Sequence, residues 1–277
     1  MDIGIAFLTG SDGMTPPALG RAVEERGFES LFYAEHTHIP VRSRRGDGSP
    51  ARGFADTYDP FVALSGAAAV TTTLKLGTGV CLVTQRDPIV LAKEVASLDR
   101  LCAGRFLFGV GAGWNRLEMA NHGTDPRRRM ALLADRVRAM REIWTAEEAE
   151  YHGEFAGFDP IWSWPKPVQR PHPPVLVGGN GPGAEDRVLD FGEQWLPQYG
   201  LLTGVGELKR RVVSLRQRAA DAGRGPIPIT LFDAAPERGL LDEFAAAGVD
   251  RCLLALQDRT ADKTLATLDE WAQLMRS

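Results

Sequence analysis

The chain has 277 residues, of which 44% are hydrophobic and 25% charged, and its formal net charge at pH 7 is −4. This is the composition of a globular protein with a sizeable core, and the acidic balance argues against a nucleic-acid partner, which needs a basic surface. No apolar run approaches the ~20 residues of a membrane span, and the start of the chain lacks a signal-peptide pattern. We therefore expect a soluble cytoplasmic protein that does not bind membranes.

Short strand-like runs alternate with longer helical patterns along the whole chain. Strands are predicted at 3–8, 30–34, 74–83, 105–110, 175–177, 194–197, 228–232 and 251–256. Helices are predicted at 16–26, 60–71, 88–101, 127–144, 183–191, 205–222, 237–246 and 262–275. Because parallel strands need helical crossovers, these units predict an α/β fold, a single (β/α)₈ TIM barrel over residues 1–277. An open doubly wound sheet is the alternative.

Predicted helix caps and two long segments without periodicity lie between these elements. Thr15, Asp59 and Asp87 each precede a proline and are predicted to cap helices. The segments 37–57 and 146–174 lack helical or strand periodicity. They are predicted to be insertion loops after the second strand and before the fifth, and we expect both to shape a substrate pocket.

The cysteines and one basic run receive simple interpretations. Cys81, Cys102 and Cys252 lie far apart and form no Cys-x-x-Cys pair, so buried free thiols in a reducing compartment are predicted. The arginines at 127–129 follow Asp125-Pro126 and are interpreted as a solvated helix start.

Ionisable residues follow the second predicted strand. Glu35 and His36 lie where a barrel strand opens into the active-site mouth, so they either meet a ligand or form a hydrogen-bonded pair that fixes the loop. His36 and His38 share a face of an extended strand, which raises the question of a metal site. Asp233 and Asp258 are the only weak further ligands, so no metal is predicted.

Glycines surround the ends of the third and fourth strands. Thr78, Gly79 and Val80 form a predicted bulge, where a planar ring or a close barrel contact would need a small residue. The run Gly111, Ala112, Gly113, Trp114 resembles a dinucleotide fingerprint only loosely. It predicts an open backbone surface that suits a flat aromatic ligand.

A glycine-rich loop joins the fifth strand to the next helix. Its residues Gly178, Gly179, Asn180 and Gly181 place free backbone N–H groups at a helix N-terminus. Such donors and the helix dipole favour phosphate binding, with a flexible turn as the alternative.

Together these segments resemble the luciferase-like monooxygenase family, and within it the coenzyme F420-dependent oxidoreductase branch of actinobacteria. The resemblance covers nearly the whole chain and is carried by the following segments: Leu76 to Val80, Asp87 to Leu101, Gly104 to Trp114, Pro165 to Pro174 and Gly178-Gly179.

The resemblance implies a usually homodimeric barrel that binds F420, a deazaflavin, at the carboxyl ends of its strands. In relatives a cis peptide at the matching Gly79-Val80 presses on the cofactor ring, and an acidic residue plus histidine occupy the place of Glu35-His36. Trp114 stands where F420-dependent sugar-phosphate dehydrogenases carry a catalytic glutamate, which argues against their chemistry.

The resulting hypothesis is hydride transfer between F420 and a small organic substrate. His36 would be the proton donor or a ring contact, and the loop 178–181 would hold the cofactor phosphate. The alternatives are an FMN-dependent two-component monooxygenase and a non-catalytic flavin-binding protein.

Overall fold

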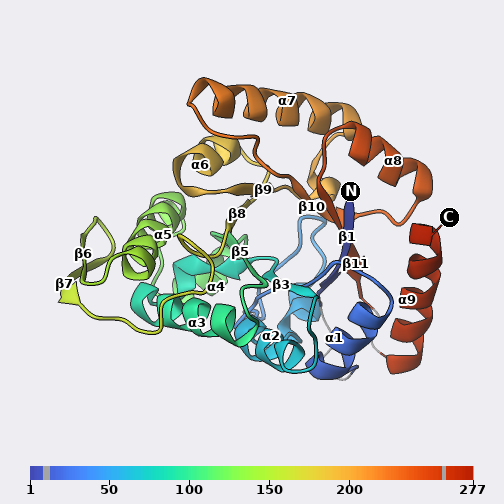
Figure 1. Ribbon diagram of the computed structural model, residues 1–277, viewed down its shortest axis with the longest axis horizontal. Helices are drawn as coiled ribbons and strands as arrows, with labels where there is room; N and C mark the ends of the chain where they lie inside the picture. Colours follow the sequence, from blue (N-terminus) through green and yellow to red (C-terminus); the bar gives the residue numbers. More distant parts are fainter. Residues whose placement is uncertain (9–12, 258–259, 277) are drawn as a thin grey trace.

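The computed structural model describes residues 1–8, 13–257 and 260–276, and it forms a barrel of parallel strands ringed by helices (Figure 1). Around the barrel the strands follow the order β10-β11-β1-β2-β3-β5-β8-β9. Their bounds are as follows: β1 (Asp2–Phe7), β2 (Ser30–Tyr33), β3 (Lys75–Thr78), β5 (Phe106–Gly111), β8 (Val175–Gly178), β9 (Gln194–Leu196), β10 (Thr230–Ala234) and β11 (Arg251–Leu256).

The barrel closes between β9 and β10. Two isolated parallel bridges, from Trp195 to Ile229 and from Gln198 to Phe232, join these outermost strands of the ordered path. The predicted TIM barrel is therefore confirmed, and the open doubly wound sheet is wrong.

Each barrel strand leads into a helix of the outer ring (Figure 1). These helices are α1 (Pro16–Glu25), α2 (Pro60–Ala68), α3 (Pro88–Leu101), α5 (Arg129–Thr145), α6 (Ala184–Phe191), α7 (Val205–Asp221), α8 (Arg238–Ala246) and α9 (Ala261–Arg276). Asp59 and Asp87 cap α2 and α3 as predicted, each accepting two backbone N–H groups. Thr15 is the N-cap residue of α1 as predicted, but its side chain makes no cap hydrogen bond.

The predicted strand 74–83 is interrupted. It divides into β3 and β4 (Cys81–Leu82), and the peptide bond between Gly79 and Val80 is cis. The cis bond falls at the pair that the family resemblance indicated. β4 still pairs with β5, so the chain leaves the barrel for two residues and returns to it.

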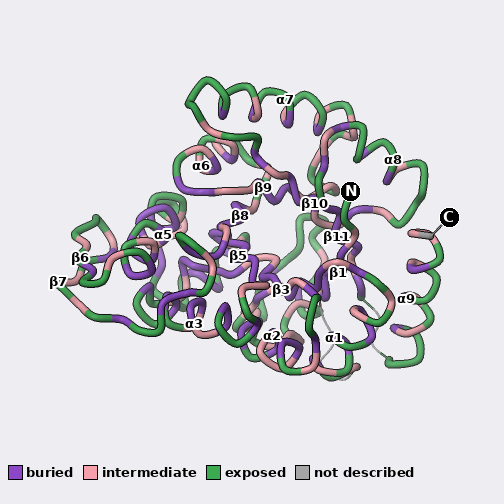
Figure 2. The backbone as a smooth tube through the Cα atoms, in the orientation of Figure 1, coloured by how far each residue is buried: buried purple, intermediate pink, exposed green. Residues whose placement is uncertain are grey.

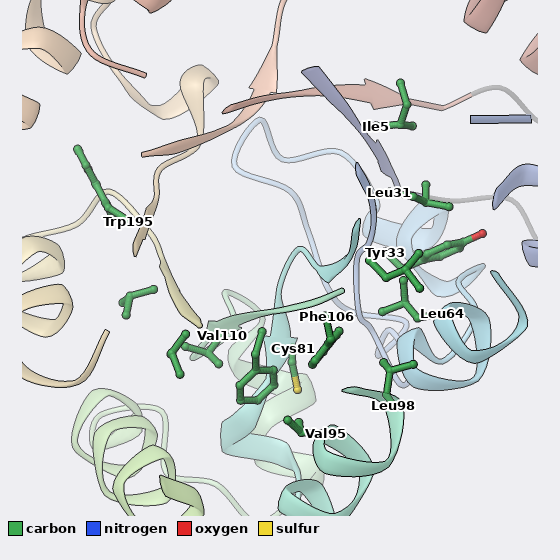
Figure 3. Close-up of a cluster of buried hydrophobic side chains, with 14 of the residues drawn as sticks. Ile5, Leu31, Tyr33, Leu64, Cys81, Val95, Leu98, Phe106, Val110 and Trp195 are labelled. Carbon is green, nitrogen blue, oxygen red and sulfur yellow. The ribbon is translucent and has the colours of Figure 1, made fainter. Parts of the chain in front are cut away.

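The core has two layers, which Figure 2 shows as buried segments on the strands and on the inward helix faces. The larger layer lies between strands and helices, and in Figure 3 Phe106, Cys81 and Leu98 gather there. The smaller layer fills the barrel with the side chains of Ala6, Phe32, Leu107, Leu176, Leu196 and Leu253. Burial of each large apolar side chain contributes about 1.5–3 kcal/mol to the stability of the fold.

The segment 146–174 is an insertion before β8, the fifth barrel strand, as predicted, but it is not wholly irregular. It contains an antiparallel hairpin, β6 (Ala149–His152) with β7 (Gly157–Ile161), which lies beyond α5 at the left edge of Figure 1. Its later part bonds α3 and the amino end of β5, where Gln169 reaches the carboxylate of Asp99 and the carbonyl of Phe106. These contacts place the later part of the segment at the amino end of the barrel, whereas the hairpin residue Glu154 pairs with Arg128 at the start of α5. A role of the segment in a substrate pocket stays a prediction.

The fold also bears on the cysteines and on the lengths of the helices. Cys81, Cys102 and Cys252 are free and buried as expected, and burial raises the pKa of each thiol. Among the described residues, no helix is both long and apolar enough to cross a membrane.

Candidate active site

The floor of the mouth is apolar. Leu8 follows β1, Val80 follows β3 and Phe232 lies within β10. All three pack onto the inner core of the barrel and are only partly buried. Side chains at the carboxyl ends of barrel strands face the mouth in this fold. A flat apolar ring therefore has a matching surface here.

His36 stands beside this floor, held by a buried carboxylate. Its Nδ1 lies 2.8 Å from Oε2 of Glu118, a residue with no solvent exposure. The other oxygen of Glu118 accepts the backbone N–H of Thr37 at 3.2 Å. Because a carboxylate accepts at both oxygens, the Nδ1 atom of His36 carries the proton and the ring is fixed in one orientation.

Trp114 covers the opposite edge of the His36 ring. Its indole Nε1 donates to Nε2 of His36 at 3.1 Å, and the two ring centroids lie 5.6 Å apart. An indole N–H only donates, so Nε2 is the acceptor, in agreement with the proton on Nδ1. The indole is 46% exposed. A ligand that displaces it would free Nε2.

Glu118 comes from a short helix that the sequence analysis missed. Helix α4 (Arg116–Asn121) begins after Asn115, whose side chain accepts the backbone N–H groups of Leu117 and Glu118. The spacing Asn115-x-x-Glu118 is a helix-start signal that was readable from the sequence. A helix of six residues is too short to be recognised from the periodic spacing of its apolar residues.

The segment 37–57 reaches the site as predicted. Its 3-10 helix η1 (Ala51–Ala55) carries Phe54, whose ring lies 5.7 Å from that of His36 and 5.8 Å from that of Trp114. Arg45 from the same segment lies over the Phe54 ring. His36, Phe54 and Trp114 thus form an aromatic wall beside the apolar floor.

Glu35 occupies a different environment from its neighbour. It is 4% exposed, and its carboxylate accepts Nε of Arg86 at 2.7 Å and the backbone N–H of Leu82 at 2.6 Å. Burial acts to lower the pKa of Arg86, but the charge of Glu35 raises it above its ordinary value. Of the two interpretations of Glu35, these contacts favour the structural one, and a catalytic role of Glu35 stays a prediction.

The glycines of β5 do not form an open surface, which corrects the prediction for this strand. A Cβ atom at Gly109 would lie 1.9 Å from the carbonyl oxygen of Thr78, and one at Gly111 would lie 2.5 Å from Cγ2 of Val80. A Cβ atom at Gly178 would lie 2.8 Å from Cγ1 of the same Val80 side chain. These glycines make room for Val80 and for the backbone that carries it.

Other predicted cofactor residues lie below the surface. Thr78 is fully buried, and its hydroxyl donates to the carbonyl of Gly109 at 2.7 Å. Ala112 is buried and its carbonyl accepts from Thr84. Gly79, Val80 and Gly113 are partly buried, and Trp114 is exposed.

The glycine-rich loop after β8 borders the mouth on the other side. The Asn180 side chain bonds the backbone N–H and carbonyl of Gln198 at 2.9 and 3.0 Å, which fixes the loop to the end of β9. Gly179 and Gly181 have no heavy atom within 4 Å of an added Cβ. A phosphate site at this loop stays a prediction.

The described residues contain no group of three potential metal ligands. His36 and His38 do not converge, because His38 bonds Thr37 and Asn121 at the rim. Asp233 lies in a bulge of β10, between Phe232 and Ala234, with φ 61°. Asp258, the other weak candidate ligand, lies outside the described residues.

Comparisons with known proteins place this geometry in context. The model of the family described as luciferase-like monooxygenase matches residues 9–234. The uncharacterized protein Rv0953c of Mycobacterium tuberculosis is 40% identical over 98% of both chains. The FMNH(2)-dependent dimethylsulfone monooxygenase of Pseudomonas putida is 30% identical over 74% of this chain and 53% of its own.

Solved structures agree on the fold. An F420-dependent secondary alcohol dehydrogenase in complex with an F420-acetone adduct superimposes with a TM-score of 0.77 at 16% identity, covering 100% of this chain and 99% of that one.

Proposed function

The chain belongs to the luciferase-like monooxygenase family, and from this premise we propose that it transfers a hydride between coenzyme F420 and a small organic substrate. The observation that carries the proposal is His36, oriented by the buried Glu118 beside an apolar floor at the carboxyl end of the barrel. Relatives with this fold include F420-dependent dehydrogenases and FMN-dependent monooxygenases.

The residues present fit a flavin or deazaflavin. Val80 and Phe232 offer an apolar surface to one face of a ring, and Gly179 and Gly181 leave space where its phosphate would approach the backbone. When bound, reduced F420 supplies a hydride from its C5 and reacts poorly with oxygen. The side chains of this protein must therefore place the substrate over the ring and handle one proton.

His36 is the group that we assign to the proton. With Glu118 accepting from Nδ1, the free position of the ring is Nε2, which Trp114 covers. When substrate displaces the indole, Nε2 takes up a proton from solvent, and the resulting imidazolium donates that proton to the substrate oxygen that gains negative charge. The Glu118 carboxylate stabilises the imidazolium before that transfer, as carboxylates do in other histidine pairs.

An FMN-dependent monooxygenase is the second candidate function. The supporting observation is the 30% identity, over 74% of this chain, to the dimethylsulfone monooxygenase. In that case the same floor would hold FMN, and His36 would serve an oxygenation. The homodimer and the cytoplasmic location stay predictions in either case.

Anaerobic single turnover tests the proposal. Protein loaded with reduced F420 is mixed with a panel of small aldehydes, ketones and enones, and the absorbance of oxidised deazaflavin is followed. We expect turnover with at least one carbonyl class, slowed about 100-fold or more in His36→Asn. No deazaflavin oxidation by any compound, together with rapid oxygen uptake with reduced FMN in a separate aerobic assay, would contradict it and support the monooxygenase.

A further inference from the structure

We propose that Asp233 is a specificity-determining residue at the mouth of the barrel, where its carboxylate selects a substrate that carries a positively charged nitrogen group. The inference rests on the proposed function for the reaction and adds the chemical class of the substrate. A β-bulge in β10, the place of the side chain beside the floor and a carboxylate without a partner carry it.

The bulge takes Asp233 out of the regular alternation of β10. Phe232 pairs with Leu253 and Ala234 pairs with Leu254, so Asp233 is an extra residue between them. Phe232 packs onto the core inside the barrel, whereas Ala234 belongs to the core between strands and helices. In an unbroken strand the residue after Phe232 would turn its side chain into that outer apolar layer. The bulge avoids this burial of the carboxylate, and bulges beside active sites re-aim side chains in the same way.

Asp233 lies close to the apolar floor of the mouth. The ring of Phe232, one residue earlier, reaches the bulge after β3, where its Cε2 lies 3.0 Å from the Cβ position of Gly79. Oδ2 of Asp233 lies 3.5 Å from the Cβ position of Gly200, in the 3-10 helix η3 (Tyr199–Leu201) that follows β9. β9 and β10 are neighbours in the barrel (Figure 1). The carboxylate is therefore at the same end of the barrel as the floor and His36.

The Asp233 carboxylate has no partner within the described part of the chain, where it forms neither a hydrogen bond nor an ion pair. The two other carboxylates of the site are matched, because Glu35 bonds Arg86 and Glu118 bonds His36. Asp233 is also only partly exposed. A partly desolvated charge without a partner is unfavourable, and a ligand with a positive group removes this cost.

The backbone at Asp233 indicates a functional role. Its φ of 61° lies in the left-handed region, which L residues other than asparagine and aspartate rarely adopt. The other described non-glycine residue with a positive φ, Ala103, lies in the turn between α3 and β5. Asp233 adopts this conformation within a strand, and no bond of its side chain holds it there. Such conformations are concentrated at sites where the direction of a side chain matters.

The charge of Asp233 decides the chemistry of its partner. A carboxylate accepts hydrogen bonds at both oxygens, and a charged N–H group forms a stronger bond with it than a neutral donor does. Because no cation of the described residues pairs with Asp233, an ammonium group supplies the missing charge, whereas a carboxylate or phosphate is repelled. The substrate would then offer its reacting carbonyl to His36 and its ammonium group to Asp233.

Calorimetric titrations with three ligands of similar shape test the assignment. The ligands are a ketone with a terminal dimethylammonium group, its neutral isopropyl analogue and its carboxylate analogue. They are titrated into protein that holds oxidised F420, so that binding is measured without turnover. Asp233→Asn keeps the shape of the side chain and tolerates the left-handed backbone. Asp2→Asn, an exposed carboxylate at the amino end of β1, is the matched control.

We expect the wild type to bind the ammonium ketone about 10-fold to 100-fold more tightly than the neutral analogue, and the carboxylate ketone most weakly. In Asp233→Asn the ammonium and neutral ketones should bind equally, while Asp2→Asn keeps the wild-type preference. Thermal unfolding is the second readout. Asp233→Asn should unfold at the wild-type temperature or above it, because the substitution removes an uncompensated charge.

Several results would overturn the inference. A wild type that binds the ammonium ketone no more tightly than the neutral one would do so, and so would an Asp233→Asn variant that keeps the preference. Weaker binding of F420 itself, with the preference unchanged, would assign Asp233 to the cofactor. A lower unfolding temperature of Asp233→Asn would identify a structural carboxylate.

Failure of the proposed function gives a different pattern. If no carbonyl compound oxidises reduced F420, the proposed function is wrong, and the same titrations with FMN-loaded protein still decide the role of Asp233. If reduced F420 is oxidised by neutral, ammonium and carboxylate ketones at equal rates, the proposed function stands and the inference fails.

Discussion

At the scale of single residues, the end of β2 gives two neighbouring side chains different environments. Glu35 turns into the ion pair with Arg86, and His36 faces the mouth under the control of Glu118. The backbone alternates sides at the end of a strand, so adjacent residues reach different neighbours. This alternation separates a structural carboxylate from the assigned proton donor.

Removal of the Glu118 charge tests its role as a positioning residue. In Glu118→Gln the His36 ring loses its carboxylate acceptor, so we expect turnover to fall about 10-fold to 100-fold with little change in cofactor affinity. The pH profile of kcat should shift as well, because the imidazolium form loses its stabilising charge. The exposed Glu148→Gln is the control, and an unchanged profile would contradict the assignment.

The structural role of Glu35 gives the opposite pattern. Glu35→Gln weakens a buried pair, but Arg86 keeps Asp59 and Glu94 as partners. We expect the free energy of unfolding to fall by about 2 kcal/mol, less than for a fully orphaned charge. Denaturant unfolding measures this change. A variant of full stability that has lost turnover would restore Glu35 to the catalytic set.

At the scale of elements, the bulge between β3 and β4 sets the floor of the site. Val80 rises from this bulge into the space left by Gly111 of β5 and Gly178 of β8. The glycines of β5 and β8 therefore shape the floor indirectly, because they leave space for the Val80 side chain. An added methyl group at either glycine would displace Val80.

Gly111→Ala and its compensation by Val80→Ala test this arrangement. The alanine Cβ would lie 2.5 Å from Cγ2 of Val80, so we expect Gly111→Ala to destabilise the fold by about 1–3 kcal/mol and to weaken cofactor binding. Removing Cγ2 in the double variant should recover part of the stability. Gly239→Ala, in open space, is the control, and additive losses in thermal unfolding would exclude the contact.

The sequence predicted the elements with long periodic patterns and failed where the chain is short or its glycines are ambiguous. Helix α3 matches its predicted bounds because apolar spacing, a capping Asp87 and a proline agree. Helix α4 is too short to show a period, and Glu118 went unnoticed with it. The role of Gly111 depends on Val80, which only the folded barrel brings next to it.

At the scale of the whole molecule, an ion-pair network at the amino end of the barrel links several strands. Arg251 of β11 bonds both oxygens of Glu29 at 2.7 Å and donates to Thr230 of β10 at 3.0 Å. Lys75 of β3 joins the same carboxylate. Although burial acts to raise it, these cations hold the pKa of Glu29 down at about 2.

Lowering the pH should therefore reduce the free energy of unfolding through protonation of Glu29. The lowered pKa means that ionised Glu29 stabilises the fold above its ordinary pKa of 4.5, and this contribution is lost as the pH falls toward about 2. We expect Glu29→Gln to lower the free energy of unfolding at pH 7 by about 2 kcal/mol, allowing for partial exposure.

Urea unfolding from pH 7 to pH 2 measures this difference, which should shrink toward zero with acid. Glu25→Gln, exposed on α1, is the control. A difference that stays constant with pH would exclude the ion pair as its source.

The central claim is that the carboxyl end of this barrel is a deazaflavin site. The most direct measurement is an equilibrium titration of the wild-type protein with F420 and with FMN, followed by fluorescence quenching. We predict saturable binding of F420, at least about tenfold tighter than that of FMN. Tight binding of FMN with no measurable binding of F420 would contradict the claim.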